Sequence, residues 1–250
     1  VTASTTAWKK VTVAWADFNK DGFQDLLVSG RLYLNKEGTQ LQEQTTKLGL
    51  QGTPSANSFV DIDNDGDLDI LFLFSSENAT VSNVLYINDW TGNLTKRDLP
   101  IAKFTNVSGF SFTDSNYDGL PDLFVSQFVT ASDPPMTLPN YFYKNNGNFV
   151  FINQSSVCKT STSRASSSCQ FIDYNNDGFQ DLYVSNGYFQ TDELWEHRGA
   201  FNYVNVIDSK KIDLDQVETS TLSHWGVGCD WYDYDNNSFP DLFLPNLCYA

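Results

Sequence analysis

The stretch DIDNDGDLD at residues 61–69 carries Asp at every odd position, and its pattern recurs four more times along the chain. The other copies are DFNKDGFQD from Asp17, DSNYDGLPD from Asp114, DYNNDGFQD from Asp173 and DYDNNSFPD from Asp233. Oxygen ligands on alternate residues of a tight turn suit a hard cation such as Ca²⁺, and the small residue at position 6 lets the backbone bend. Asp, Asn and Gly also occur in ordinary turns, but five copies with one spacing predict metal-binding loops.

Each of these acidic loops is expected to bind one Ca²⁺, so the chain would hold up to five. The predicted ligands are the side chains at positions 1, 3, 5 and 9 and the main-chain carbonyl at position 7. In chain order these residues are Asp17, Asn19, Asp21, Phe23 and Asp25; Asp61, Asp63, Asp65, Asp67 and Asp69; Asp114, Asn116, Asp118, Leu120 and Asp122; Asp173, Asn175, Asp177, Phe179 and Asp181; and Asp233, Asp235, Asn237, Phe239 and Asp241. The second loop should bind most tightly and the fifth, with Asn237 and Ser238 in place of Asp-Gly, most weakly.

The sequence around the loops repeats as well. An aromatic residue lies two positions before each first Asp, at Trp15, Phe59, Phe112, Phe171 and Trp231. Large apolar residues follow each ninth-position Asp, so each loop is predicted to join two strands. A third strand is expected at 32–35, 85–88, 141–145 and 194–197, and a fourth after the next Gly, for example at 147–151. The first Asp residues are 44, 53, 59 and 60 residues apart, a spacing typical of four-stranded propeller blades.

Position 12 distinguishes these loops from EF-hands, which need a bidentate Glu there and flanking helices. This chain has apolar strand residues at that position: Val28, Phe72, Val125, Val184 and Leu244. From about Val11 to Leu247 the sequence instead resembles the FG-GAP/VCBS repeat family. The resemblance implies a calcium-binding β-propeller like those of integrin α-chains and several lectins. The Phe-Gly signature is reduced and the Gly-Ala-Pro segment is missing, so no integrin ligand is expected.

We therefore predict an all-β chain, with residues 1–250 in a single β-propeller domain and repeats that start near residues 11, 55, 108, 167 and 226. Four repeats carry four strands, whereas the fifth ends after its second strand. A half blade leaves an exposed sheet edge. We expect a larger propeller, with further blades before Val1 or after Ala250, or a neighbouring chain that completes the sheet. Residues 1–10 could supply one closing strand but not two.

The acidity of the chain comes mostly from the loops. Sixteen of its 31 acidic residues occupy side-chain ligand positions, and five bound Ca²⁺ would change the net charge from −16 to −6. A negative protein without a basic face is a poor partner for nucleic acid or an anionic membrane. The longest apolar run, residues 70–74, is too short to span a bilayer.

The composition and the predicted calcium loops fit an extracellular protein, either secreted or on the cell surface, whereas cysteines and glycosylation sequons are less decisive. Four cysteines allow three pairings, of which Cys158–Cys169 and Cys229–Cys248 are preferred, and four free thiols are the alternative. Sequons, whose number matches chance, start at Asn78, Asn93, Asn106, Asn153 and Asn236.

No catalytic motif is present: the chain has no G-x-S-x-G elbow, phosphate loop or H-E-x-x-H sequence. Its two histidines, His197 and His224, are expected to be turn or packing residues. We predict a non-catalytic, calcium-stabilised extracellular module for recognition or adhesion, with a glycan or protein ligand. Two alternatives are a carbohydrate-active enzyme domain, either a polysaccharide lyase or a glycosidase, and a structural repeat of an extracellular assembly.

The ligand is expected to bind on the rim opposite the acidic loops, because the connections there vary in length. These connections are Ser75–Val81, Thr130–Pro139, Asn186–Asp192, Gln154–Ser168 and Ile207–Ser223. Trp225, Tyr188 and Phe189 are the candidate contacts.

Overall fold

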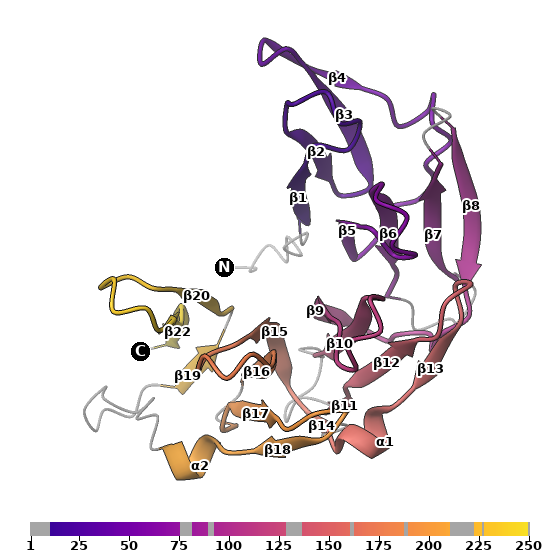
Figure 1. Cartoon of the computed structure of the whole chain (residues 1–250). Coiled ribbons are helices and arrows are strands. Elements are labelled where there is room, and N and C mark those ends of the chain that lie inside the picture. Colours follow the sequence, from indigo (N-terminus) through magenta and orange to yellow (C-terminus); the bar gives the residue numbers. More distant parts are fainter. Residues whose placement is uncertain are drawn as a thin grey trace, which may run out of the picture.

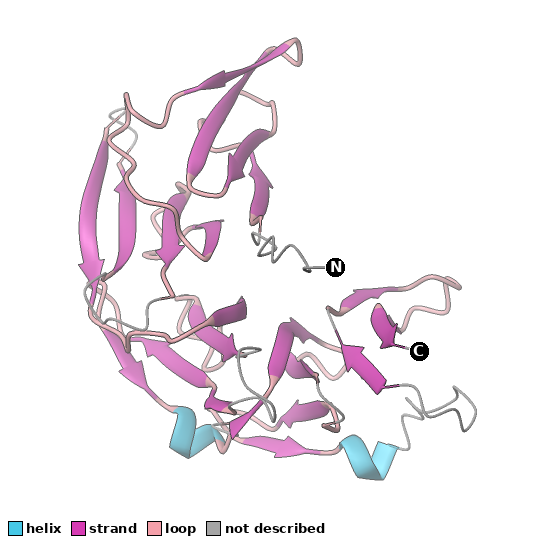
Figure 2. Ribbon diagram, turned by 180° about the vertical axis from the view of Figure 1, so that it is seen from behind, coloured by secondary structure: helices cyan, strands magenta, loops and turns pink. Residues whose placement is uncertain are grey.

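The computed structural model describes residues 11–75, 82–89, 93–128, 137–160, 163–187, 190–210, 223–226 and 228–249, with the backbone alone described at 209–210, 223–226 and 246–249. Within these residues the regular secondary structure is almost entirely β-strand. Four four-stranded antiparallel sheets and a shorter fifth unit follow one another along an open arc (Figure 1), which is also seen from behind in Figure 2. The predicted all-β class and the antiparallel four-stranded sheets are confirmed.

Each four-stranded sheet is built from strands that follow one another in the sequence. The first contains β1 (Val13–Ala16), β2 (Asp25–Val28), β3 (Arg31–Lys36) and β4 (Gln40–Glu43). The second contains β5 (Ala56–Val60), β6 (Asp69–Leu73), β7 (Asn83–Asn88) and β8 (Leu94–Leu99). The third contains β9 (Val107–Thr113), β10 (Asp122–Gln127), β12 (Tyr141–Asn145) and β13 (Phe151–Asn153). The fourth contains β15 (Ser166–Ile172), β16 (Asp181–Asn186), β17 (Glu193–His197) and β18 (Tyr203–Asn205).

The fifth unit has only the equivalents of a first and a second strand in the described residues. They form two short pairs, β19 (Ser223–Gly226) with β22 (Asn246–Tyr249) and β20 (Asp230–Tyr232) with β21 (Asp241–Phe243). A further pair, β11 (Leu138–Pro139) with β14 (Ser163–Arg164), joins two connections. The short helices α1 (Ser155–Cys158) and α2 (Ile207–Lys210) follow β13 and β18, and the sequence pattern did not predict them.

One register error concerns the fourth strand predicted at residues 147–151. The structure begins β13 only at Phe151. Asn148 and Phe149 have positive φ angles of 51° and 62°, and the Val150 N–H donates to the Gly147 carbonyl at 3.0 Å. These residues therefore form the turn that reverses the chain, and the strand starts after it.

The hydrophobic core is divided into layers between successive sheets. Along β6, Ile70 and Phe72 pack toward the first sheet, whereas Leu71 and Leu73 pack toward the third. Successive side chains of a strand point to opposite faces, so a strand between two sheets is buried on both of them. This explains why β6 is buried along its whole length and reads as a continuous apolar run instead of an alternating one.

The recurring aromatic before each loop fills these layers. Phe59, Phe112 and Phe171 pack in the layers between the first and second, second and third, and third and fourth sheets, respectively. Trp231 packs against the fourth sheet. Trp15 is 55% exposed because no described sheet precedes its own. At the other end of the arc, Phe243 is 69% exposed. Both ends therefore present apolar side chains that have no neighbouring sheet in the described part of the chain.

Candidate metal centre

All five acidic loops begin and end at the same register of the two strands that they connect. The residue before the first Asp pairs with the ninth-position Asp in every copy: Ala16 with Asp25, Val60 with Asp69, Thr113 with Asp122, Ile172 with Asp181 and Tyr232 with Asp241. Each strand pair thus holds its loop between the residue before the first predicted ligand and the ninth-position ligand.

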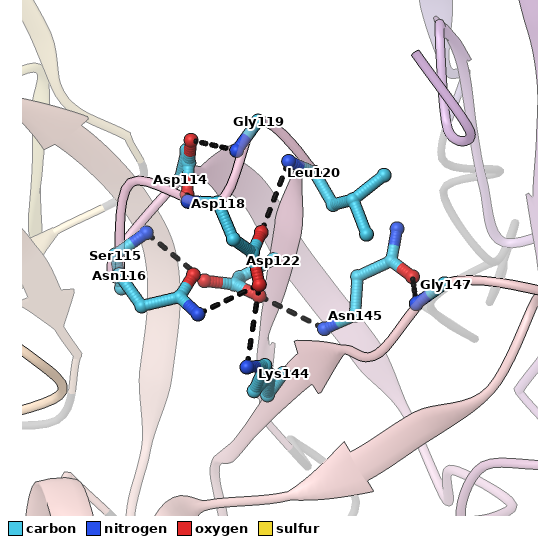
Figure 3. Close-up of polar contacts among 10 residues, drawn as sticks. All are labelled: Asp114, Ser115, Asn116, Asp118, Gly119, Leu120, Asp122, Lys144, Asn145 and Gly147. Atoms are coloured by element: carbon cyan, nitrogen blue, oxygen red, sulfur yellow. Dashed lines mark hydrogen bonds and ion pairs between the residues drawn. The ribbon is translucent and has the colours of Figure 1, made fainter.

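The third loop shows how the loop backbone folds around its first Asp (Figure 3). The Asp114 carboxylate accepts the N–H of Asp118 at 3.1 Å through Oδ1 and the N–H of Gly119 at 2.8 Å through Oδ2. Asp118 Oδ1 in turn accepts the Leu120 N–H at 3.1 Å. The corresponding bonds occur in all the other loops. The fifth loop keeps this geometry although Asn237 and Ser238 replace Asp-Gly.

The ninth-position carboxylate connects the loop to the sheet. Asp122 is fully buried; its Oδ2 accepts the N–H of Ser115 at 2.9 Å and its Oδ1 accepts the N–H of Asn145, on the third strand, at 2.8 Å. Asp25 and Asp69 make the same two bonds, and Asp181 accepts the third-strand N–H of His197. The third strand therefore fixes the ninth carboxylate of its own loop.

The residue that supplies this third-strand N–H was not singled out from the sequence. It is Asn35, Asn88, Asn145 or His197, and its recurrence at the end of the third strand was the available signal. The Asn35 and Asn88 amide groups donate to the position-8 carbonyls of their own loops. The Asn145 amide instead donates to the carbonyl of Ile62, in the second loop, at 2.8 Å. These asparagines thus brace the loops against the sheets.

His197 is a packing residue in the structure. It is 1% exposed, and its ring stacks on Tyr203 with centroids 4.5 Å apart. Burial lowers the pKa of this imidazole. The His224 side chain lies outside the described residues.

Burial also raises the pKa of the ninth-position carboxylates. It raises the pKa of Asp69, Asp122 and Asp181 to about 7, although backbone N–H groups act in the opposite direction. In the second loop burial, with the neighbouring Asp65 carboxylate, raises the pKa of Asp67 to about 7. Removing carboxylates from water and placing like charges together both disfavour the ionised form. A bound cation would reverse this balance.

Several buried oxygen atoms in the loops have no hydrogen-bond partner. They are Asp63 Oδ1, Asn116 Oδ1 and Asp181 Oδ2, which belong to predicted ligand side chains, and both carboxylate oxygens of Asp67. An unpaired buried polar atom is costly, and a cation would satisfy it. In addition, carboxylate oxygens of Asp61, Asp63 and Asp65 lie within 4.8 Å of one another, as do those of Asp233, Asp235 and Asp241. The donor set is oxygen only, which fits Ca²⁺.

Two loops depart from this common arrangement. In the third, the Lys144 ammonium lies 3.2 Å from Asp118 Oδ2 (Figure 3) and supplies a positive charge at a predicted ligand. In the fifth, Asp241 is partly exposed and accepts the Tyr234 N–H at 3.0 Å, but the described residues provide no third strand to donate to its other oxygen.

The predicted disulfides are wrong. Cys158 and Cys229 are free thiols, so neither Cys158–Cys169 nor Cys229–Cys248 is formed. Cys158 and Cys169 instead pack within the apolar layer between the third and fourth sheets. Burial raises the pKa of the Cys158 thiol to about 12 and that of Cys229 to about 11, which disfavours the reactive thiolate.

The predicted ligand-contact residues lie largely outside the described part of the chain. Tyr188, Phe189 and the Trp225 side chain are not described, nor are residues 76–81, 129–136 and 211–222 of the connections, or residues 1–10. Among the described residues, no helix has the length and apolar character that a membrane span requires.

The chain is similar to a known repeat family in sequence and to a known lectin in fold. The protein family described as "FG-GAP-like repeat" matches residues 61–125 and 128–184 of this chain. No curated protein matches the chain. Among solved structures, a similar one is an Agrocybe aegerita lectin described by its specific recognition of non-reducing terminal N-acetylglucosamine. It is 13% identical, with a TM-score of 0.54, and the match covers 94% of this chain and 66% of that chain. The chain thus spans just under two thirds of the lectin, and the likeness concerns the fold.

The raised carboxylate pKa values predict the pH dependence of the protein in EDTA. Folded Asp69, Asp122 and Asp181 hold protons up to about pH 7, whereas an unfolded Asp releases its proton near pH 4. The native state therefore binds more protons between these values, and its free energy of unfolding should fall as pH rises from 5 to 7. The upper bound is about 1.4 kcal/mol per pH unit and carboxylate. Urea unfolding measures this slope.

Asp122→Asn is the matched control for that slope, because an amide does not titrate. It should make the dependence on pH shallower. Stability that rises with pH over this range would contradict the assignment.

Proposed function

Since this chain carries FG-GAP-like repeats, we propose that it is a calcium-stabilised, non-catalytic recognition module that binds a glycan or protein ligand outside the cell. The observation that carries the proposal is the unpaired, buried oxygen set of the acidic loops. The likeness to a lectin fold supports a recognition role. A protein ligand could bind to the same scaffold as a glycan, so both ligand classes are retained.

Within each loop the chain's own residues would hold the ion. The carboxyl and amide oxygens at positions 1, 3, 5 and 9, with the carbonyl at position 7, supply the ligands. The backbone N–H groups at positions 5, 6 and 7 fix the carboxylates before metal arrives. Calcium, when bound, would neutralise the converging negative charge and satisfy the unpaired oxygens. The loops would then hold the first and second strands of each sheet together.

The proposed architecture is a β-propeller in which each sheet is a blade. Its support is the stacking of successive sheets along an arc (Figure 1) with apolar layers between them. The exposed Trp15 and Phe243 leave apolar surface at both ends of the described arc, on which another sheet could pack.

The proposed ligand face is the rim opposite the acidic loops, as the variable connections suggest. Described polar residues on one of these connections include Gln190, which accepts the N–H of Ala165 at 2.7 Å, and Asp192, which accepts the Tyr183 hydroxyl at 2.6 Å. These bonds would hold the connection in place on a rigid sheet. An extracellular location would permit glycans on the exposed sequon residues Asn93 and Asn153.

Removal of calcium should lower the melting temperature. A loop filled at a calcium concentration of 100 times its Kd contributes about 2.7 kcal/mol, which corresponds to roughly 5–10 °C for a chain of this size. Scanning calorimetry in calcium and in excess EDTA measures the difference. Asp61→Asn with Asp65→Asn should remove much of it, whereas Asp233→Asn with Asp235→Asn, in the weakest loop, should remove less. Identical melts with and without EDTA would refute the calcium assignment.

A glycan array, with terminal N-acetylglucosamine among its sugars, tests the ligand class. We expect binding by the calcium-loaded protein and weaker binding in EDTA. A parallel assay for released sugar tests the non-catalytic assignment, because turnover of any bound glycan would show an enzyme instead. Absence of glycan binding together with capture of a defined extracellular protein would favour the protein ligand.

A further inference from the structure

Contacts between neighbouring acidic loops follow one rule. The residue at position 4 of one loop reaches position 6 of the next. The Tyr117 hydroxyl, in the third loop, donates to the carbonyl of Gly178, in the fourth, at 3.0 Å. The Asn176 amide of the fourth loop donates to the carbonyl of Ser238, in the fifth, at 2.6 Å. The two contacts occupy equivalent positions, so they are a property of the repeat.

The second and third loops approach each other at the same positions. A Cβ atom added to Gly119, at position 6, would lie 3.1 Å from the Asn64 amide nitrogen, at position 4 of the loop before. Position 4 has a positive φ in all five loops, between 53° and 59°. Non-glycine residues rarely adopt this conformation, so its recurrence shows that the loop geometry imposes it.

Both partners in each contact lie beside predicted metal ligands. Tyr117 is flanked by Asn116 and Asp118. Gly178 lies between Asp177 and Phe179, and its N–H donates to the first-position Asp173 at 2.9 Å. Tyr117 also packs edge-on against the Phe179 ring with centroids 5.8 Å apart. A metal ion in the third loop would order the donor side of this contact, and one in the fourth loop would order the acceptor side.

We propose that the position-4 residues couple adjacent acidic loops, so that calcium binding in one loop favours binding in the next, with Tyr117 as the positioning residue between the third and fourth loops. This inference rests on the proposed calcium function. The coupling arises because a loop ordered by its own ion presents a fixed partner to its neighbour, which then loses less conformational entropy when it binds. Reciprocity requires that the effect operate in both directions.

Hydrogen exchange followed by mass spectrometry during a calcium titration reads each loop separately. In the unmodified protein, residues 114–122 and 173–181 should gain protection as calcium is added. The fourth loop is disabled with Asp173→Asn and Asp177→Asn, which leave side-chain size nearly unchanged. We expect the calcium concentration for half-protection of the third loop to rise roughly two- to tenfold, as loss of one such contact predicts.

Tyr117→Phe isolates the contact, because it removes only the hydroxyl. Alone, it should raise the half-protection concentration of both loops, and in this background disabling the fourth loop should have little further effect on the third. Tyr33→Phe is the matched control, since Tyr33 is a partly exposed residue on β3 of the first sheet, and it should change neither loop. The reciprocal arm disables the third loop with Asp114→Asn and Asp118→Asn and follows the fourth.

Two results would overturn the coupling while leaving the calcium function intact. In the first, each loop gains protection with calcium, but the half-protection concentration of the third loop does not change when the fourth loop is disabled. In the second, the third loop's response persists undiminished in Tyr117→Phe. If calcium protects no loop in the unmodified protein, the proposed calcium function itself fails, and the coupling fails with it.

Discussion

The bond between the third-strand N–H and the buried ninth-position carboxylate is the interaction on which the candidate site depends. It fixes one predicted ligand to the sheet, as Asn145 does for Asp122 at 2.8 Å. The first-position carboxylate then accepts hydrogen bonds from the N–H groups of the loop backbone. Burial raises the pKa values of the ninth-position carboxylates toward 7. Without a counter-charge, the ionised forms of these clustered carboxylates are therefore unfavourable. The fold thus gathers a cluster of carboxylates that a bound cation would stabilise.

The layered packing explains how this site can be repeated. The second strands β6, β10 and β16 are buried on both faces, so successive sheets stack along an arc, and the acidic loops come to lie side by side. Their contacts at positions 4 and 6 are a consequence of that stacking. A change that altered the spacing between sheets would therefore alter the loops as well, which links the apolar core to the proposed metal sites.

Much of this could be read from the sequence. Repetition of the acidic pattern, together with apolar residues after each ninth Asp, predicted the strand pairs and third strands. The start of β13 could not be predicted, since the positive φ values of Asn148 and Phe149 are set by turn geometry that residue type leaves open. The disulfide pairings failed because proximity along the chain says little about whether two thiols face each other. The role of Asn145 was missed, because its recurrence at the end of the third strand does not show which carboxylate its backbone N–H contacts.

Crystallography with anomalous scattering from calcium-soaked protein tests the central claim most directly. The account predicts anomalous peaks inside the acidic loops, each surrounded by oxygens from positions 1, 3, 5 and 9 and the carbonyl at position 7, with the second loop the most fully occupied. Loops that keep the hydrogen bonds described above and show no peak at saturating calcium would contradict it.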